Sequence, residues 1–174
     1  EKGFSGSYDS VKCFVRKIRK KSPQVFAVIP TEPGLEAQVD YGRGAPTKHP
    51  LTGKYKRPWL FSMKLSHSRK AFRKAVWKSS SEVWCQLHEE AFRYFGGAPK
   101  TIKLDNLKEG VLKPDIYDPQ LNPLYEAMCK HYGVVALPCR VRTPHHKGKV
   151  ESDIKYAQNA LKGRTFESEE DQNR

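Results

Sequence analysis

Residues 35–42 read LEAQVDYG, and this stretch predicts the first strand of a sheet. Apolar and polar residues alternate along positions 35–41, which is the period of a strand that buries one face. The strand closes on an acid, Asp40, and is followed by Gly42. An acid at the end of a half-buried strand marks this edge of the sheet as a candidate functional edge.

The segments that follow predict the rest of the sheet. Residues 59–66 and 70–77 have the composition of strands and are joined by a short polar turn, which predicts an antiparallel hairpin or meander. Residues 101–104 and 134–137 are short apolar runs typical of buried strands. With the helices between them, the order is β-β-β-α-β-α-β-α. This order predicts an α/β fold, in which a mixed five-stranded sheet is flanked by helices on both faces.

Three helices are predicted within this order. The first begins with a capping box, Ser79 with Glu82, and runs to the glycines at 96–97. The second covers residues 122–131 and starts with an Asn-Pro pair suited to a helix N-terminus. The third covers residues 149–161, where apolar residues recur on one side.

The chain also carries segments outside this predicted sheet. Residues 1–22 contain one amphipathic helix, and residues 23–34 are rich in proline and read as a linker with one candidate strand at 25–29. We expect the core to span residues 35–164. Residues 165–174 carry an excess of acids and read as an acidic tail.

The charge of the chain favours a polyanionic partner. It has 32 Lys and Arg against 19 Asp and Glu, a net charge of +13. This charge is segregated, since the 41 residues between Asp40 and Glu82 include eleven basic side chains and no acidic ones. Such a segment favours binding to nucleic acid phosphates, with the strong salt dependence that counterion release produces.

Composition excludes other classes of protein. An aromatic content of 11% argues against a disordered chain, and no stretch approaches the roughly 20 apolar residues that cross a bilayer. Four cysteines without a CxxC pair favour reduced thiols and therefore an intracellular setting.

Three carboxylates stand at the ends of different predicted elements. Asp40 ends the first strand, Asp105 follows the fourth, and Glu151 opens the last helix. If they converge, divalent cations are needed to offset their repulsion, and oxygen ligands of this kind suit Mg²⁺. A pair of such ions supports phosphoryl transfer. Spacing alone leaves open that each acid is an ordinary exposed or capping carboxylate.

Three strings resemble the catalytic core of IstA-type transposases. They are AQVDYG at 37–42, KLDNLKEGV at 103–111 and PHHKGKVE at 144–151. These transposases are DDE recombinases of the retroviral-integrase-like superfamily and have a ribonuclease-H-like fold. The resemblance covers about residues 35–161 and implies that Asp40, Asp105 and Glu151 are the D, D and E of the catalytic triad. Tyr41 stands where the family usually has tryptophan, which is a conservative difference.

The resemblance implies an activity and its partners. The activity is Mg-dependent DNA cleavage at transposon ends followed by strand transfer into target DNA. Two Mg²⁺ ions, replaceable by Mn²⁺, would be held by the three acids. A homo-oligomer, an AAA+ ATPase helper of the IstB type and a place at the bacterial nucleoid in the cytoplasm are also implied. Residues 1–22 would be the end of a helix-turn-helix DNA-binding region, and the chain a fragment without its C-terminal segments.

Basic side chains near the three acids are candidate DNA contacts. One group follows Asp40, a second precedes Glu151, and a third lies on the last helix. They are Arg43, Lys54, Lys56, Arg57, Arg140, Arg142, His145, Lys147, Lys149, Lys155 and Lys162. Lys155 is four positions after Glu151, so an ion pair between them is an alternative to a DNA contact.

Two other functions remain open. One is a ribonuclease-H-like nuclease or resolvase that only hydrolyses DNA and takes a carboxylate from the first helix of the core, where Glu82, Glu89 and Glu90 are available. The other is a DNA-binding protein that has kept the fold and lost catalysis.

Overall fold

The computed structural model describes residues 7–18, 30–105, 109–113, 120–138 and 150–174. The chain divides into two units, Glu1–Pro30 and Thr31–Arg174. In the first unit, α1 (Tyr8–Ile18) supplies the predicted amphipathic helix. The candidate strand at 25–29 lies outside the described residues.

The second unit is built on a mixed five-stranded sheet, with strand order β5-β4-β1-β6-β9. The strands are β1 (Glu36–Arg43), β4 (Trp59–Leu65), β5 (Ala71–Val76), β6 (Thr101–Leu104) and β9 (Val135–Pro138). The pairs β1–β4 and β4–β5 are antiparallel, whereas β1–β6 and β6–β9 are parallel. The central strand β1 therefore joins the antiparallel half of the sheet to the parallel half.

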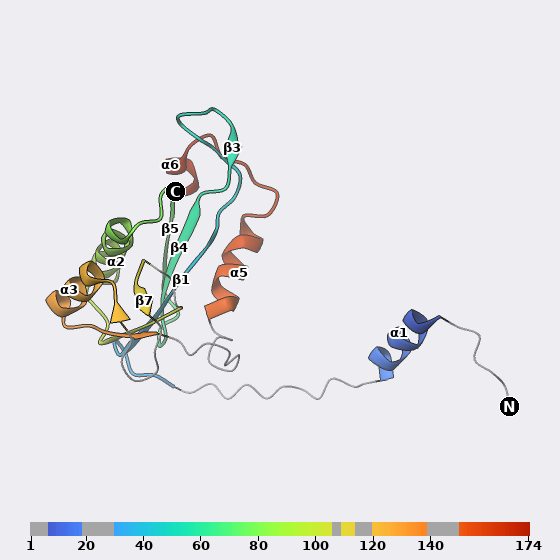
Figure 1. The fold of residues 1–174 in the computed structure, drawn as a ribbon, viewed down its shortest axis with the longest axis horizontal. Coiled ribbons are helices and arrows are strands. Elements are labelled where there is room, and N and C mark those ends of the chain that lie inside the picture. Colours follow the sequence, from blue (N-terminus) through green and yellow to red (C-terminus); the bar gives the residue numbers. More distant parts are fainter. Residues whose placement is uncertain (1–6, 19–29, 106–108, 114–119, 139–149) are drawn as a thin grey trace. The chain divides into compact units, whose positions relative to one another are not determined.

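Helices lie on both faces of this sheet (Figure 1). The helices α2 (Ser81–Phe95) and α3 (Pro123–Tyr132) pack together on one face. The helix α5 (Val150–Ala160) lies on the other face, against β1 and β4. As predicted, α3 is capped by Asn122 and ends at Gly133. The predicted α/β fold is confirmed. None of the helices in the described ranges is long and apolar enough to cross a membrane.

The start of α2 differs by one residue from the predicted capping box. Ser80, not Ser79, is the N-cap, and its Oγ accepts a hydrogen bond from the backbone N–H of Val83 at 3.4 Å. Ser79 instead donates its hydroxyl hydrogen to Glu109. The capping box predicted from Ser79 and Glu82 is therefore wrong by one residue, since the residue three positions after Ser80 is Val83. Gly96, with φ of 83°, ends the helix as predicted.

Alternate residues of β1 face different surroundings. Ala37 and Val39 have no exposed surface and belong to the core under α2 and α3. Gly42 faces α5, because a Cβ added there would lie 2.5 Å from Cγ2 of Ile154. Asp40 is two positions from Gly42 and therefore shares the α5 face of the sheet.

The core on the α2 face is rich in aromatic rings. The ring centroids of Trp84 and His88 are 4.6 Å apart, and those of Phe61 and Trp84 are 5.5 Å apart. His88 has no exposed surface, and its Nδ1 donates to the Trp84 carbonyl oxygen at 2.8 Å. Burial lowers the pKa of His88 to about 4. The histidine is therefore a neutral member of the core near pH 7.

Two short hairpins add to the predicted elements. One pairs β2 (Thr47–Lys48) with β3 (Tyr55–Lys56), and the other pairs β7 (Val111–Lys113) with β8 (Gln120–Leu121). Strands of two or three residues are too short to show an alternating pattern, which is why the sequence does not predict them.

Residues 165–174 pack on the core, although the sequence predicts an acidic tail. They contain α6 (Glu169–Gln172), which contacts β2 and β5. Asn173 holds the backbone of Ala75 on β5: its Oδ1 accepts from the N–H at 2.6 Å, and its Nδ2 donates to the carbonyl at 3.1 Å. The compact unit accordingly extends to Arg174, beyond the predicted boundary.

Candidate active site

Asp40 and Asp105 occupy neighbouring positions on two parallel strands. Asp40 is the fifth residue of β1, which continues to Arg43 and does not end at this acid as the sequence predicts, whereas Asp105 directly follows β6. In the β1–β6 ladder, Val39 is paired with Leu104. Asp40 directly follows Val39, and Asp105 directly follows Leu104. Adjacent strands are about 4.8 Å apart. Residues far apart in the sequence are thus brought together by strand register.

The chemistry of this pair fits a divalent cation. Both aspartates are half-buried, and Oδ1 of Asp40 accepts a hydrogen bond from the backbone N–H of Tyr41 at 2.8 Å. This bond fixes the orientation of the Asp40 carboxylate. Neighbouring carboxylates repel unless a cation lies between them, and Mg²⁺ prefers oxygen ligands.

The helix α5 runs along β1 in the same direction as the strand. Ile154 lies against Gly42, and Nε2 of Gln158 donates to the carbonyl oxygen of Arg43 at 3.1 Å. Later residues of α5 thus lie beside later residues of β1. The first turn of α5, which precedes Ile154, therefore lies near the earlier part of β1 that contains Asp40.

Glu151 lies in that first turn. It is three positions before Ile154 and seven before Gln158, a spacing that places all three positions on one side of the helix. The side chain of Glu151 lies outside the described part of the structure. Among the side chains that are described, no three His, Cys, Asp or Glu are arranged to hold a metal ion. The complete triad of Asp40, Asp105 and Glu151 stays a prediction.

Glu36, another acid on the α5 face of β1, belongs to a structural network. Its Oε2 lies 2.7 Å from Nζ of Lys103, and its Oε1 accepts from Ser66 at 2.7 Å and from Gln38 at 3.3 Å. Burial alone would raise the pKa of Glu36, but these hydrogen bonds and the charge of Lys103 lower it. This carboxylate is therefore ionised and already matched with a protein cation.

The acids of α2 lie on the other side of the sheet. Oε2 of Glu90 is 2.7 Å from Nζ of Lys74, and Oε2 of Glu89 is 3.4 Å from the Arg93 guanidinium. Glu82 is in the first turn of α2. Because α2 covers the face opposite α5, the arrangement does not support a metal site that combines Asp40 with an acid of α2.

Some predicted DNA contacts surround a pocket beyond the end of β1. Arg57 and Lys162 line it, together with the backbone around Gly44. The guanidinium of Arg43 instead stacks on the ring of Trp59, 3.7 Å from its centroid. A further lining residue, Arg164, is absent from the predicted set. Its position after the last helix carried no pattern, so only the folded chain reveals it.

The other predicted DNA contacts are dispersed or undescribed. Lys54 and Lys56 are exposed at the β2–β3 hairpin, and Lys155 is exposed on α5. The remaining five lie outside the described residues: Arg140, Arg142, His145, Lys147 and Lys149.

A second feature that sequence reasoning missed links α2 to the segment after Asp105. Ser79, just before α2, donates its hydroxyl hydrogen to Glu109. Burial, and to a smaller degree the charge of Glu109, raises the pKa of Tyr41, the neighbour of Asp40. The string at 103–111 contains Glu109, but its partners become visible only in the fold.

A family model described as the integrase core domain matches residues 30–144. The chain belongs to the integrase core domain family. This family implies a transposase or integrase type of enzyme that depends on divalent metal.

Curated relatives of this integrase core are transposases. The putative transposase Rv3428c of Mycobacterium tuberculosis is 40% identical over 140 residues, covering 80% of this chain and 34% of the relative. The transposase for insertion sequence element IS21 of Pseudomonas aeruginosa is 30% identical over 155 residues, covering 88% and 39%. The chain thus spans well under half the length of these relatives. The predicted membership among insertion-sequence DDE transposase cores is confirmed.

Solved structures share the fold of this integrase core. The catalytic core domain of BIV integrase has a TM-score of 0.50 at 11% identity, covering 70% of this chain and 65% of that chain. A chain of the simian T-cell lymphotropic virus intasome, solved with the PP2A regulatory subunit B56 gamma, has a TM-score of 0.52 at 16% identity, covering 72% and 38%. These likenesses confirm the predicted ribonuclease-H-like fold.

Proposed function

We propose that this integrase core cleaves DNA at transposon ends and transfers the freed ends into target DNA, with Mg²⁺ held by Asp40, Asp105 and Glu151. The pairing of Val39 with Leu104 is the observation that carries the proposal, because it makes the two aspartates neighbours at the active edge of the sheet. The transposase relatives support the reaction class.

The protein groups have distinct roles in this proposal. Asp40 and Asp105 supply carboxylate oxygens from the sheet, and Glu151 supplies a third carboxylate from α5. The Tyr41 N–H holds one oxygen of Asp40 at 2.8 Å. Paired divalent ions, when bound, activate the attacking water or hydroxyl and stabilise the leaving oxygen. Lys103 stays with Glu36 and does not compete for the two aspartates.

The partners of the longer protein are proposed from the family resemblance. They are DNA at both transposon ends, a second copy of the chain and an AAA+ ATPase helper, in the bacterial cytoplasm at the nucleoid. Residues 1–22 are proposed as the end of a DNA-binding helical region. The excess of Lys and Arg supports DNA as the polyanionic partner.

Nicking of DNA in Mg²⁺ by the wild-type chain and by Asp105→Asn tests the catalytic site. We expect the variant to nick at least about 100-fold more slowly, because a neutral amide holds a divalent ion poorly. Binding to the same DNA in the absence of metal should persist, since affinity resides in the basic residues. Glu126→Gln is a matched control that removes one negative charge on α3. Equal nicking by Asp105→Asn and the wild type would reject the site.

Joining of pre-cleaved DNA ends separates the proposal from its nearest alternative. A transposase core transfers these ends to a second DNA molecule, whereas a nuclease or resolvase only hydrolyses. Efficient hydrolysis without joining would favour the hydrolytic alternative.

A further inference from the structure

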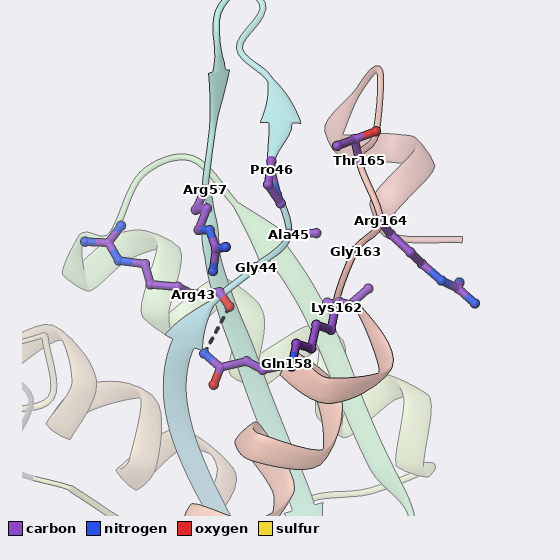
Figure 2. Close-up of a pocket in the computed structure, with 11 residues that line it drawn as sticks. Arg43, Gly44, Ala45, Pro46, Arg57, Gln158, Lys162, Gly163, Arg164 and Thr165 are labelled. Atoms are coloured by element: carbon purple, nitrogen blue, oxygen red, sulfur yellow. Dashed lines mark hydrogen bonds between the residues drawn. The ribbon is translucent and has the colours of Figure 1, made fainter.

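A basic pocket lies at the end of α5 that is remote from Glu151 (Figure 2). Its volume is about 250 Å³, and it lies between the loop after β1 and the segment after α5. Figure 2 shows Arg57 on one side of the Gly44–Pro46 loop and Lys162 and Arg164 on the other. None of its described lining residues is acidic. The pocket therefore presents a local excess of positive charge.

Hydrogen bonds to the backbone hold both sides of this pocket. Gly44 donates its N–H to the carbonyl of Pro58 at 2.9 Å, and Phe166 donates its N–H to the carbonyl of Pro46 at 3.0 Å. A Cβ on Gly44 would lie 2.4 Å from Nε2 of Gln172, so the loop lies close to α6 and a larger residue there would displace the Gln172 side chain. The pocket is thus a fixed part of the core.

The pocket is aligned with the candidate active site. Gly44 is four residues after Asp40, which is roughly 13 Å along an extended chain. Lys162 is eleven residues after Glu151, which is roughly 16 Å along a helix. Both segments run along the α5 face of the sheet, since the hydrogen bond from Gln158 to the carbonyl oxygen of Arg43 holds α5 beside β1. Successive phosphates of one strand rise about 3.4 Å along the duplex axis and also turn around it, so these spans correspond to a few nucleotides.

We propose that this pocket binds a backbone phosphate of the DNA substrate, a few nucleotides from the phosphate that is cleaved at Asp40 and Asp105. The proposal rests on the proposed function for the DNA substrate and the place of cleavage. Arg57 suits this ligand, because the planar guanidinium can donate two parallel hydrogen bonds to phosphate oxygens. Arg164 also lines the pocket, although its guanidinium extends away from the Gly44–Pro46 loop (Figure 2). Lys162 adds a third positive charge. The pocket thereby fixes the register of the DNA and reads no base.

Salt dependence of DNA binding tests the phosphate contact without any need for cleavage. The 174-residue chain is titrated with a short duplex in EDTA at several KCl concentrations. We expect Arg57→Gln and Arg164→Gln each to reduce the slope of log K against log [KCl] by about one, and the double variant by about two. At fixed salt each single variant should bind about tenfold more weakly.

A charge-matched double variant controls for the loss of overall positive charge. Lys100→Gln with Lys130→Gln removes two positive charges from exposed positions before β6 and on α3. This control should keep nearly the wild-type slope. An equal fall in slope for the control and the pocket double variant would overturn the proposal, because general charge would then explain the binding.

Uncharged methylphosphonate linkages locate the bound phosphate. We expect one such linkage, within a few nucleotides of the mapped cleavage position, to weaken wild-type binding about tenfold and to have little effect on the Arg57→Gln, Arg164→Gln double variant. The same penalty in both proteins would overturn the proposal. If the wild type does not cleave DNA in Mg²⁺, the proposed function fails, while the salt slopes still decide whether the pocket binds phosphate.

Discussion

The two faces of the central sheet differ in chemistry although the same strands form both. Toward α2 and α3 the strands present apolar and aromatic side chains, such as Val39, Phe61 and Leu104, which are at most 1% exposed. Toward α5 they present polar side chains, including Gln38 and Asp40. Because side chains alternate along a strand, one face can supply stability while the other carries charged groups.

The comparison predicts that substitutions on the two faces have different consequences. Changes on the α2 face should alter mainly the free energy of unfolding. Changes on the α5 face should alter metal binding and DNA cleavage, with smaller effects on folding. Exceptions are expected only where α5 itself touches the sheet, as at Gly42.

Phe61→Ala removes an aromatic ring from the core between the sheet and α2, and it should have the largest effect on the free energy of unfolding. Phe61 is completely buried, and its ring contacts those of Trp84 and His88 at centroid distances of 5.5 and 5.3 Å. We expect the free energy of unfolding to fall by about 3–5 kcal/mol, measured by urea denaturation. Asp40→Asn is the partner variant on the other face, with an expected change below about 1 kcal/mol. A loss below 1 kcal/mol for Phe61→Ala would contradict the assignment of the core.

Acid titration tests the same aromatic core through His88. Above pH 6.5 this histidine is neutral in both the folded and the unfolded chain. As the pH falls from 6.5 to about 4, the unfolded chain binds a proton that the folded core excludes, so the folded state loses stability. The loss reaches about 3 kcal/mol below pH 4.

A variant without the imidazole isolates this contribution from those of the acids. His88→Phe should show a free energy of unfolding that falls less steeply between pH 6.5 and 4 than in the wild type. Parallel curves for the two proteins would mean that His88 titrates normally and is not enclosed by the core.

Gly42→Ala tests the contact between α5 and the sheet, with a smaller expected change in stability than Phe61→Ala. The added Cβ would lie 2.5 Å from Ile154, so α5 must shift. We expect a loss of about 1–3 kcal/mol in the free energy of unfolding. Nicking should fall more than stability explains, because α5 carries Glu151. Gly97→Ala is a matched control, since a Cβ there meets no atom within 4 Å. Unchanged nicking by Gly42→Ala would separate α5 from the active site.

Most of the fold follows from local patterns in the sequence. Strand alternation at 35–41 predicts β1 and the burial of Ala37 and Val39, although Gln38, on the other face, is buried as well. Asn122 and Gly133 predict both ends of α3. The pattern fails at the start of α2. The capping box predicts Ser79 as the cap, but Ser80 caps the helix and Ser79 contacts Glu109.

The same distinction applies to the candidate site. Asp105 is predictable because it ends a recognisable strand, whereas Asp40 lies inside β1, which continues to Arg43; parallel pairing makes the two aspartates neighbours. Arg164 and the packing of residues 165–174 are not predictable, because they depend on how the chain returns to the loop at Gly44 after α5. The excess of acids in residues 165–174 predicts a solvated tail, because the sequence alone does not show the contacts that these residues make.

Binding of Mn²⁺ to the 174-residue chain, measured by calorimetry, tests the central claim most directly. We expect Asp40→Asn, Asp105→Asn and Glu151→Gln each to weaken Mn²⁺ binding by about 10- to 100-fold. Glu36→Gln, on the same face of β1 but paired with Lys103, should leave the affinity unchanged. Equal Mn²⁺ affinity in the wild type and the three variants would contradict a metal site built from these acids.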